Sequence, residues 1–271
     1  MKKILLFLLI VCVNPLWADD YITISDIRYR QDVTSTKECP CDLDLYYPKD
    51  QKGYSSVVWF HGGGLTSGKK EIPEELKNSG LAVIAVNYRL MPHVSLSDCI
   101  DDAAAAVAWT FNHIEEYGGR TDRIIVAGHS AGGYLTNMIG LDRKWLGKYN
   151  INPDSIALLV PFSGHAISHF AYRKAKGMDE KQPSIDEFAP LYYVRGNASP
   201  IVIISGDRNM ELLGRYEETA YFWRMLKENG HQQVYLYELD GYNHGDMAKP
   251  AFHILKEHVN KLKQTKDIKN Q

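Results

Sequence analysis

The chain has little of what marks nucleic-acid-binding, zinc-binding or membrane-spanning proteins. Its 31 Lys and Arg residues do not outnumber its 33 Asp and Glu residues, so no basic surface is expected to attract nucleic acid. The closely spaced pair Cys39 and Cys41 has no second cysteine pair with which it could form a zinc site. The apolar run from Ile4 to Val13 is shorter than the roughly 20 residues that span a bilayer. We therefore expect no nucleic-acid partner, no metal and no stable membrane span.

The first 20 residues have the plan of a secretory signal peptide. Two lysines precede the apolar run, and Ala18 supplies a small residue before two aspartates. We predict cleavage after Ala18, which makes residues 1–18 the signal peptide and residues 19–271 one exported domain, periplasmic or secreted. The alternative is a lipoprotein signal with attachment at Cys12, but such a signal usually has a small residue just before its cysteine.

An odd number of cysteines follows the predicted cleavage site. Cys39, Cys41 and Cys99 remain, and an exported protein can form disulfides. At least one thiol should stay unpaired unless chains cross-link. We expect a buried thiol at Cys99, with Cys39 or Cys41 available for a structural bridge.

Most later apolar runs are continuous and rich in Val and Ile, as strands buried on both faces of a parallel sheet require. Helical patterns separate them, which predicts an α/β fold with a mostly parallel central sheet flanked by helices. Two alternating segments, 21–29 and 41–48, predict antiparallel strands at its start. The expected central strands are 55–64, 81–90, 123–130, 155–164, 200–207 and 233–241, and the expected helices are 97–119, with Ser97 as N-cap, 214–230 and 250–264.

Residues 165–198 fit neither pattern and interrupt the alternation. Long excursions inside compact domains are usually functional or disordered. We therefore expect a short lid-like insertion over the site. Its aromatic residues Tyr192 and Tyr193 could shape a pocket, although packing is the simpler role for each of them.

The segment "GHSAGG", residues 128–133, fits the G-x-S-x-G pattern and follows an expected strand. At a sharp strand-to-helix turn, these glycines permit the strained backbone that exposes a nucleophilic serine. The pattern predicts Ser130 as a nucleophile. The alternative role for a serine at this position is to cap the following helix.

A glycine-rich loop, "HGGG" at residues 61–64, follows another expected strand. Together with the amide after the nucleophile, such a loop supplies the N–H donors of an oxyanion hole. We predict that the amides of Gly63, Gly64 and Ala131 form it. His61 is expected to brace the loop and not to transfer protons.

Among ten histidines, His244 has the position of a general base. A triad of this type runs serine, acid, histidine along the chain, with the histidine after the last strand. His244 follows the last expected strand, has glycines nearby on both sides and precedes the last helix. His231, His253 and His258 lie in a turn or in that helix and are expected to be structural.

The motifs "HGGG", "VNYRLMP", "GHSAGGYL" and "GYNHG" occur in this order. From about Cys41 onward, the chain resembles the carboxylesterases of the α/β-hydrolase superfamily. More narrowly, it is similar to the hormone-sensitive-lipase-like group and the neighbouring bacterial acetyl and feruloyl esterases. The resemblance implies an α/β-hydrolase fold and ester hydrolysis through an acyl-enzyme, with no cofactor.

The acid of the predicted triad departs from that superfamily. The acid there commonly lies three residues after the glycine that ends its strand, and here this position holds Asn209, whose amide carries no charge. Asp207 lies nearest the strand end and is our first choice, although it could instead brace the loop. Glu211 is the alternative acid, because its extra methylene could let the carboxylate reach His244 from a displaced backbone.

The sequence thus favours an exported serine carboxylesterase. Its substrate would be a small-molecule or carbohydrate ester, with acetyl or feruloyl groups on polysaccharide suggested by analogy alone. Two alternatives stay open: amide or peptide hydrolysis by the same residues, and a catalytically silent binding protein of the same fold, which Asn209 motivates. No oligomeric state is indicated.

Overall fold

The structure, a computed structural model, describes residues 20–33, 40–212 and 214–269. From residue 265 onward it describes the backbone alone. The predicted signal peptide, residues 1–18, and Cys39 therefore lie outside the described residues. Within them, no helix has the length and apolar character needed to cross a membrane.

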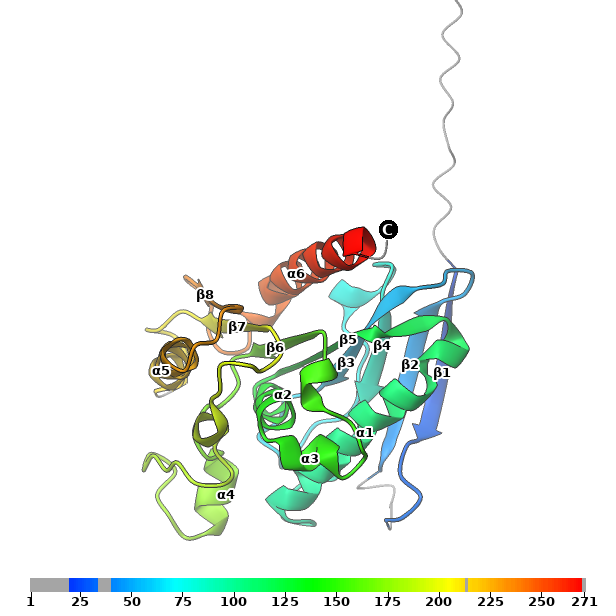
Figure 1. Ribbon diagram of the computed structural model, residues 1–271. Coiled ribbons are helices and arrows are strands. Elements are labelled where there is room, and N and C mark those ends of the chain that lie inside the picture. Colours follow the sequence, from blue (N-terminus) through cyan, green and yellow to red (C-terminus); the bar gives the residue numbers. More distant parts are fainter. Residues whose placement is uncertain (1–19, 34–39, 213, 270–271) are drawn as a thin grey trace, which may run out of the picture.

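The described residues form one eight-stranded sheet in the order β1-β2-β4-β3-β5-β6-β7-β8 (Figure 1). The pairs β1–β2 and β2–β4 are antiparallel, and all others are parallel. A mostly parallel sheet with an antiparallel start is thereby confirmed. The strands are β1 Tyr21–Arg28, β2 Asp42–Pro48, β3 Tyr54–Phe60, β4 Ala82–Val86, β5 Gly119–His129, β6 Leu158–Phe162, β7 Ile201–Gly206 and β8 Val234–Leu239.

Helices cover both faces of the sheet. Successive side chains of a strand point to opposite faces, so Val58 and Phe60 of β3 belong to one core cluster and Val57 and Trp59 to the other. Figure 1 shows α1 and α2 on one face and α6 on the other. The helices are α1 Leu96–Tyr117, α2 Ala131–Leu141, α3 Arg143–Gly147, α4 Phe170–Ala175, α5 Arg215–Glu228 and α6 Ala248–Lys269, with 3₁₀ turns η1 Glu74–Leu76, η2 Pro153–Ser155 and η3 Pro190–Tyr193.

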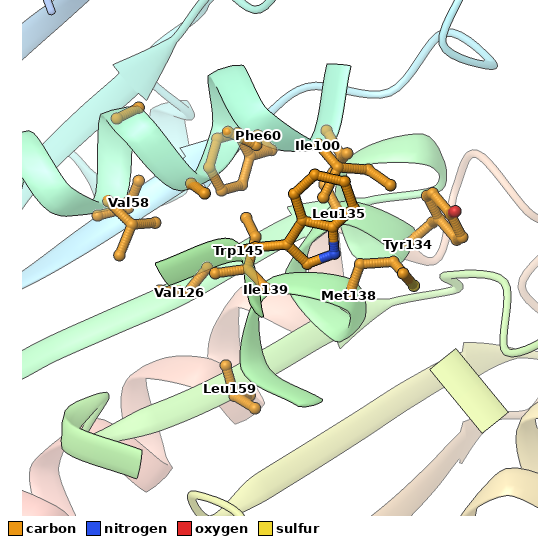
Figure 2. Packing of buried hydrophobic residues seen from close by; sticks show 14 of the residues in the cluster. Val58, Phe60, Ile100, Val126, Tyr134, Leu135, Met138, Ile139, Trp145 and Leu159 are labelled. Atoms are coloured by element: carbon orange, nitrogen blue, oxygen red, sulfur yellow. The ribbon is translucent and has the colours of Figure 1, made fainter. Parts of the chain in front are cut away.

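All 11 residues of helix α2 are buried. Figure 2 shows Leu135 and Ile139 of α2 beside Trp145 of α3, with Phe60 of β3 close by. Fully burying an aliphatic side chain contributes about 1.5–3 kcal/mol. This packing holds the N-terminus of α2 in place against the sheet.

The N-terminus of α1 differs from its prediction. The helix begins at Leu96, and its N-cap is Ser95, not Ser97. The Ser95 hydroxyl accepts from the Asp98 amide, and the Asp98 carboxylate accepts from the Ser95 amide. A capping box needs an acidic or amide side chain three residues after the serine. Asp98 lies three residues after Ser95, whereas Ile100 lies three residues after Ser97, so Ser95 is the N-cap. Gly118, with φ 101°, ends it as expected.

Both cysteines of the described residues are buried. Cys99 is a thiol within α1, as predicted. The Sγ atom of Cys41 lies 3.6 Å from Oδ2 of the buried Asp102. A bridge that involves Cys39 stays a prediction, because that residue lies outside the described part of the chain.

The connections of the sheet diverge between β3 and β5, and we call the region outside the carboxyl ends of these two strands the β3/β5 crevice. The chain leaves β3 toward β4 on one side, whereas it leaves β5 toward β6 on the other. Ligand sites in open α/β sheets usually lie where neighbouring connections diverge in this way. The glycine loop follows β3 and Ser130 follows β5, so both predicted motifs border this crevice.

Candidate active site

Ser130 occupies the turn between β5 and α2 with φ 55° and ψ −112°. Non-glycine residues rarely adopt such a conformation, which is typical of strained functional turns. Two glycines permit it. A Cβ on Gly128 would lie 2.5 Å from the carbonyl carbon of Gly132, and a Cβ on Gly132 would collide with the carbonyl oxygen of Phe60. The G-x-S-x-G spacing is thus required because the turn packs directly against β3.

His244 contacts Ser130 across the crevice. Its Nε2 atom lies 2.9 Å from Ser130 Oγ, and the Ser130 side chain makes no capping hydrogen bond. His129 supports this loop, because its Nε2 lies 2.8 Å from the His244 carbonyl oxygen. Burial and the nearby His244 lower the pKa of His129 to about 4. His129 is therefore neutral near pH 7 and donates its Nε2–H to that carbonyl.

The carboxylate beside His244 belongs to Glu211. Its Oε2 lies 2.8 Å from His244 Nδ1, and its Oε1 accepts from Ser163 Oγ at 2.6 Å and from the Gly206 amide at 3.0 Å. Burial alone would raise the pKa of Glu211. The hydrogen bonds from His244 and Ser163 outweigh burial and lower this pKa to about 2.

Asp207, the first choice from the sequence, does not contact His244. Its carboxylate accepts from the amides of Asn209 and Gly241, both at 2.8 Å, and these bonds lower its pKa. Its own amide donates to the Tyr242 carbonyl at 2.8 Å. Asp207 thus ties the loop after β7 to the loop of His244, which is the bracing role weighed as its alternative.

A tight turn at residues 207–211 explains why Glu211, and not Asp207, lies beside His244. The amides of Met210 and Glu211 both donate to the Asp207 carbonyl. The turn carries Glu211 back toward Gly206, while Asn209 is exposed. The charge missing at Asn209 is therefore supplied from two residues further along the chain.

Ser163 is a site residue that the sequence reasoning missed. It follows β6, is fully buried and has φ 45°. Its Oγ lies 2.6 Å from Glu211 Oε1 and 2.9 Å from His244 Nδ1, and its carbonyl accepts from the Arg215 guanidinium. Its position in the sequence could have identified it, because a serine at the carboxyl end of this parallel strand lies at the same sheet edge as Ser130.

These contacts determine which nitrogen of His244 carries the proton. The Glu211 carboxylate can only accept, so Nδ1 must be the donor. Nε2 then offers its lone pair to the Ser130 hydroxyl. Such an arrangement can remove the serine proton and stabilise the imidazolium that forms.

The glycine loop lies directly against Ser130. A Cβ on Gly62 would be 3.5 Å from Ser130 Cβ. Gly63 and Gly64 have φ of 106° and 64°, in the region that favours glycine. Ala131 is the first residue of α2, where amides lack partners within the helix. All three predicted oxyanion donors therefore belong to the two segments that meet at Ser130, and their role stays a prediction.

His61 packs beneath this loop. Its buried ring stacks on Tyr88 with centroids 4.5 Å apart, and its Nδ1 lies 2.7 Å from the Gly62 carbonyl oxygen. Burial lowers its pKa, which keeps the ring neutral. A Cβ on Gly68 would also collide with the ring. The His61 ring thus packs tightly between Tyr88 and the backbone of the loop.

The other three histidines considered from the sequence do not contact Ser130 or Glu211. Nε2 of His231 lies 3.1 Å from the Ser199 carbonyl oxygen, and Nε2 of His258 lies 2.9 Å from the Tyr237 hydroxyl. His253 is exposed on α6.

Two cavities flank the site. One, of about 870 Å³, is lined by Gly62, His129 and the start of α6. The other, of about 650 Å³, lies between residues 165–183 and the segment before α5. Phe170 lines this second cavity, and its Cζ would lie 3.0 Å from a Cβ on Gly64. The insertion therefore reaches the glycine loop, whereas Tyr192 and Tyr193 line neither of these cavities.

A family model matches the chain, and two known proteins with similar sequences are named as esterases. A family model described as BD-FAE matches residues 43–213. A probable isoprenylcysteine alpha-carbonyl methylesterase of Oryza sativa is 29% identical over 232 residues, which are 76% of this chain and 54% of that protein. Esterase LipC of Mycobacterium tuberculosis is 25% identical over 248 residues, 85% of this chain and 58% of the relative. The chain thus spans a little more than half the length of these two relatives.

Solved structures share the fold. A truncated form of a carbohydrate esterase from gut microbiota has a TM-score of 0.74 at 17% identity, over 90% of this chain and 97% of that one. Thermogutta terrifontis esterase 2, phosphoramylated by tabun, has a TM-score of 0.70 at 21% identity, over 89% and 94%. The expected α/β-hydrolase fold is confirmed.

The depressed pKa of Glu211 predicts a specific acid sensitivity. Its pKa falls from the ordinary 4.5 to about 2 on folding, so the ionised group stabilises the fold above pH 4.5 and loses this effect as the pH falls toward 2. The shift corresponds to at most about 3 kcal/mol. Urea unfolding of Glu211→Gln should therefore show a weaker loss of stability between pH 5 and pH 2 than the parent protein.

The exposed Glu116 offers a matched control. Glu116→Gln should keep the parental pH dependence. An unchanged acid dependence in Glu211→Gln would contradict the linkage between this carboxylate and stability.

Proposed function

The chain belongs to the BD-FAE family, and we propose that it is a serine-dependent carboxylic ester hydrolase. One observation carries the proposal: the continuous contact Ser130–His244–Glu211, placed beside the glycine loop in the β3/β5 crevice. A nucleophile, a base and a group that orients the base are the parts that acyl transfer requires.

The mechanism begins when Ser130 Oγ attacks the ester carbonyl and His244 Nε2 takes its proton. The amides of Gly63, Gly64 and Ala131 hold the oxyanion of the tetrahedral intermediate. When the C–O bond to the alcohol breaks, His244 returns the proton to the departing oxygen, which leaves an acyl-enzyme.

Water then repeats these steps. His244 takes a proton from the water as its oxygen attacks the acyl carbonyl, and gives that proton to Ser130 Oγ when the second intermediate collapses. Throughout, Glu211 remains ionised and stabilises the imidazolium, which its low pKa favours.

The contact between Glu211 and His244 also bears on the rival binding-protein hypothesis. That hypothesis rested on Asn209, an amide in the position of the acid. Since another carboxylate occupies the place beside the base, Asn209 no longer argues against activity. No contact in the described residues favours amide over ester hydrolysis.

The finer proposals concern substrate and location. We propose carbohydrate-linked acetyl or feruloyl esters as substrates, by analogy with the esterases that the sequence motifs resemble and with the carbohydrate esterase of the same fold. Export to the periplasm or medium is supported by the signal pattern of residues 1–18, which lie outside the described residues. A panel of 4-nitrophenyl esters beside acetylated and feruloylated oligosaccharides tests the substrate class.

Covalent labelling tests the nucleophile. A fluorophosphonate should add one phosphonyl group to the folded protein, and peptide mass spectrometry should locate it on Ser130. Ser130→Ala should take up none. Failure of the folded parent protein to react would favour the silent binding protein.

A pair of isosteric variants tests the acid. Glu211→Gln should lower kcat for 4-nitrophenyl acetate by about 10³- to 10⁴-fold, because the amide cannot stabilise the imidazolium. Asp207→Asn should keep kcat within about tenfold and lower the melting temperature, since its bonds are to the backbone. The reverse ranking of the two kcat values would contradict the role of Glu211.

Removal of the Ser163 hydroxyl tests its support of Glu211. We expect Ser163→Ala to lower kcat about 10- to 100-fold, the effect of a hydrogen bond to a charged group, with KM nearly unchanged. Ser163→Gly removes the same hydroxyl but tolerates φ 45°. Equal losses in kcat would assign the effect to the hydroxyl, whereas a normal rate in the glycine variant would assign it to backbone strain.

A further inference from the structure

The cavity of about 650 Å³ adjoins both catalytic loops. Its lining includes Phe170, which lies against the glycine loop at Gly64, and Leu212, the neighbour of Glu211. Much of its lining is apolar, from Ile167, Phe170, Pro183 and Leu212. An ester held in the crevice would extend part of its structure into this space.

One group of polar residues in the cavity wall is internally satisfied. Arg215 Nε donates to Glu218 Oε1 at 3.0 Å, and Glu218 Oε2 accepts two backbone amides. His165 bridges the pair, with Nδ1 2.7 Å from Glu218 and Nε2 2.7 Å from Arg215. Burial and Arg215 lower the pKa of His165 to about 4, so the ring is neutral. The charges of Arg215 and Glu218 therefore cancel.

Arg173 of α4, which also lines the cavity, has no such compensation. It is only 4% exposed. Its Nη1 and Nη2 atoms donate to the uncharged carbonyls of Ser168 and Glu180, and its Nε has no partner in the described part of the chain. Within the described ranges, no carboxylate oxygen lies within 4 Å of this guanidinium.

An unpaired buried charge is costly, because the protein interior solvates it poorly. Burial lowers the pKa of Arg173, and Glu218 only partly offsets this effect. At the rim, Glu180 and Lys181 are exposed and of opposite sign. The cavity wall therefore carries one net positive charge, which matches a monoanion and not a doubly charged phosphate.

We propose that this cavity is a substrate subsite for a carboxylate, with Arg173 as its receptor. The esters preferred by the protein would carry a carboxylate that an apolar spacer separates from the reacting carbonyl. This inference rests on the proposed ester hydrolysis and narrows its substrate class to acidic esters.

Matched ester pairs test the subsite on either half of the substrate. For the acyl half, 4-nitrophenyl hemiglutarate is compared with 4-nitrophenyl pentanoate. For the alcohol half, 4-acetoxybenzoate is compared with its methyl ester. After subtraction of spontaneous hydrolysis, we expect the charged member of at least one pair to have a kcat/KM about 10- to 100-fold above its neutral partner.

Substitution of Arg173 should remove this preference selectively. Arg173→Gln should lower kcat/KM for the charged ester by that same factor and change the neutral ester by less than about threefold. Lys174→Gln makes the same change of charge at an exposed position of α4 and should keep the preference. Equal losses for charged and neutral esters would show that Arg173 only holds the insertion together, which would overturn the proposal.

If Arg173→Gln does not fold, the ester preference of the parent protein alone tests the subsite. Hydrolysis of the neutral esters without preference for either charged ester would overturn the subsite and leave the proposed function intact. If no ester is hydrolysed, the proposed function fails, and calorimetry with the monoanions pentanoate and 4-methylbenzoate on Ser130→Ala tests the subsite separately. Binding that high salt weakens would support it, and absence of binding would overturn it.

Discussion

The close packing of the Ser130 turn against β3 is the constraint on which the site depends. Gly132 lies so near the Phe60 carbonyl that no side chain fits between them, and the buried helix α2 holds the turn there. The same contact brings Ser130 beside the glycine loop that leaves β3. A nucleophile and its candidate oxyanion donors are thus joined by backbone geometry. The connections of the sheet diverge at this point, which is where open α/β sheets usually bind their ligands.

The remaining parts reach Ser130 along the same sheet edge, through the loops after β7 and β8, which bind each other. Asp207 connects the loops after β7 and β8 through backbone amides, and Glu211 connects the same loops through His244. One carboxylate therefore positions the backbone, and the other positions the base. Ser163 adds a third strand end to this assembly. The strongly lowered pKa of Glu211 follows from this convergence, since several donors compensate for its burial.

The sequence was sufficient for features that depend on local pattern. Continuous apolar runs predicted the parallel strands, and motif order predicted which serine and histidine would meet. It was insufficient where a short turn decides the outcome. The choice between Asp207 and Glu211 depended on how residues 207–211 fold back, and the choice between Ser97 and Ser95 on which hydroxyl could reach Asp98. Ser163 escaped notice because its role exists only when three strand ends come together.

The contrast between Glu211 and Arg173 gives the clearest indication of what the site is built to receive. Both are charged groups removed from water, yet Glu211 accepts from several hydrogen-bond donors, whereas Arg173 donates to two neutral carbonyls and its Nε has no partner in the described part of the chain. A protein can retain an uncompensated buried charge when a ligand supplies the partner, because the cost is then recovered on binding. The fixed negative charge of Glu211 thus serves the base, and the unmatched positive charge belongs to a residue that lines the cavity.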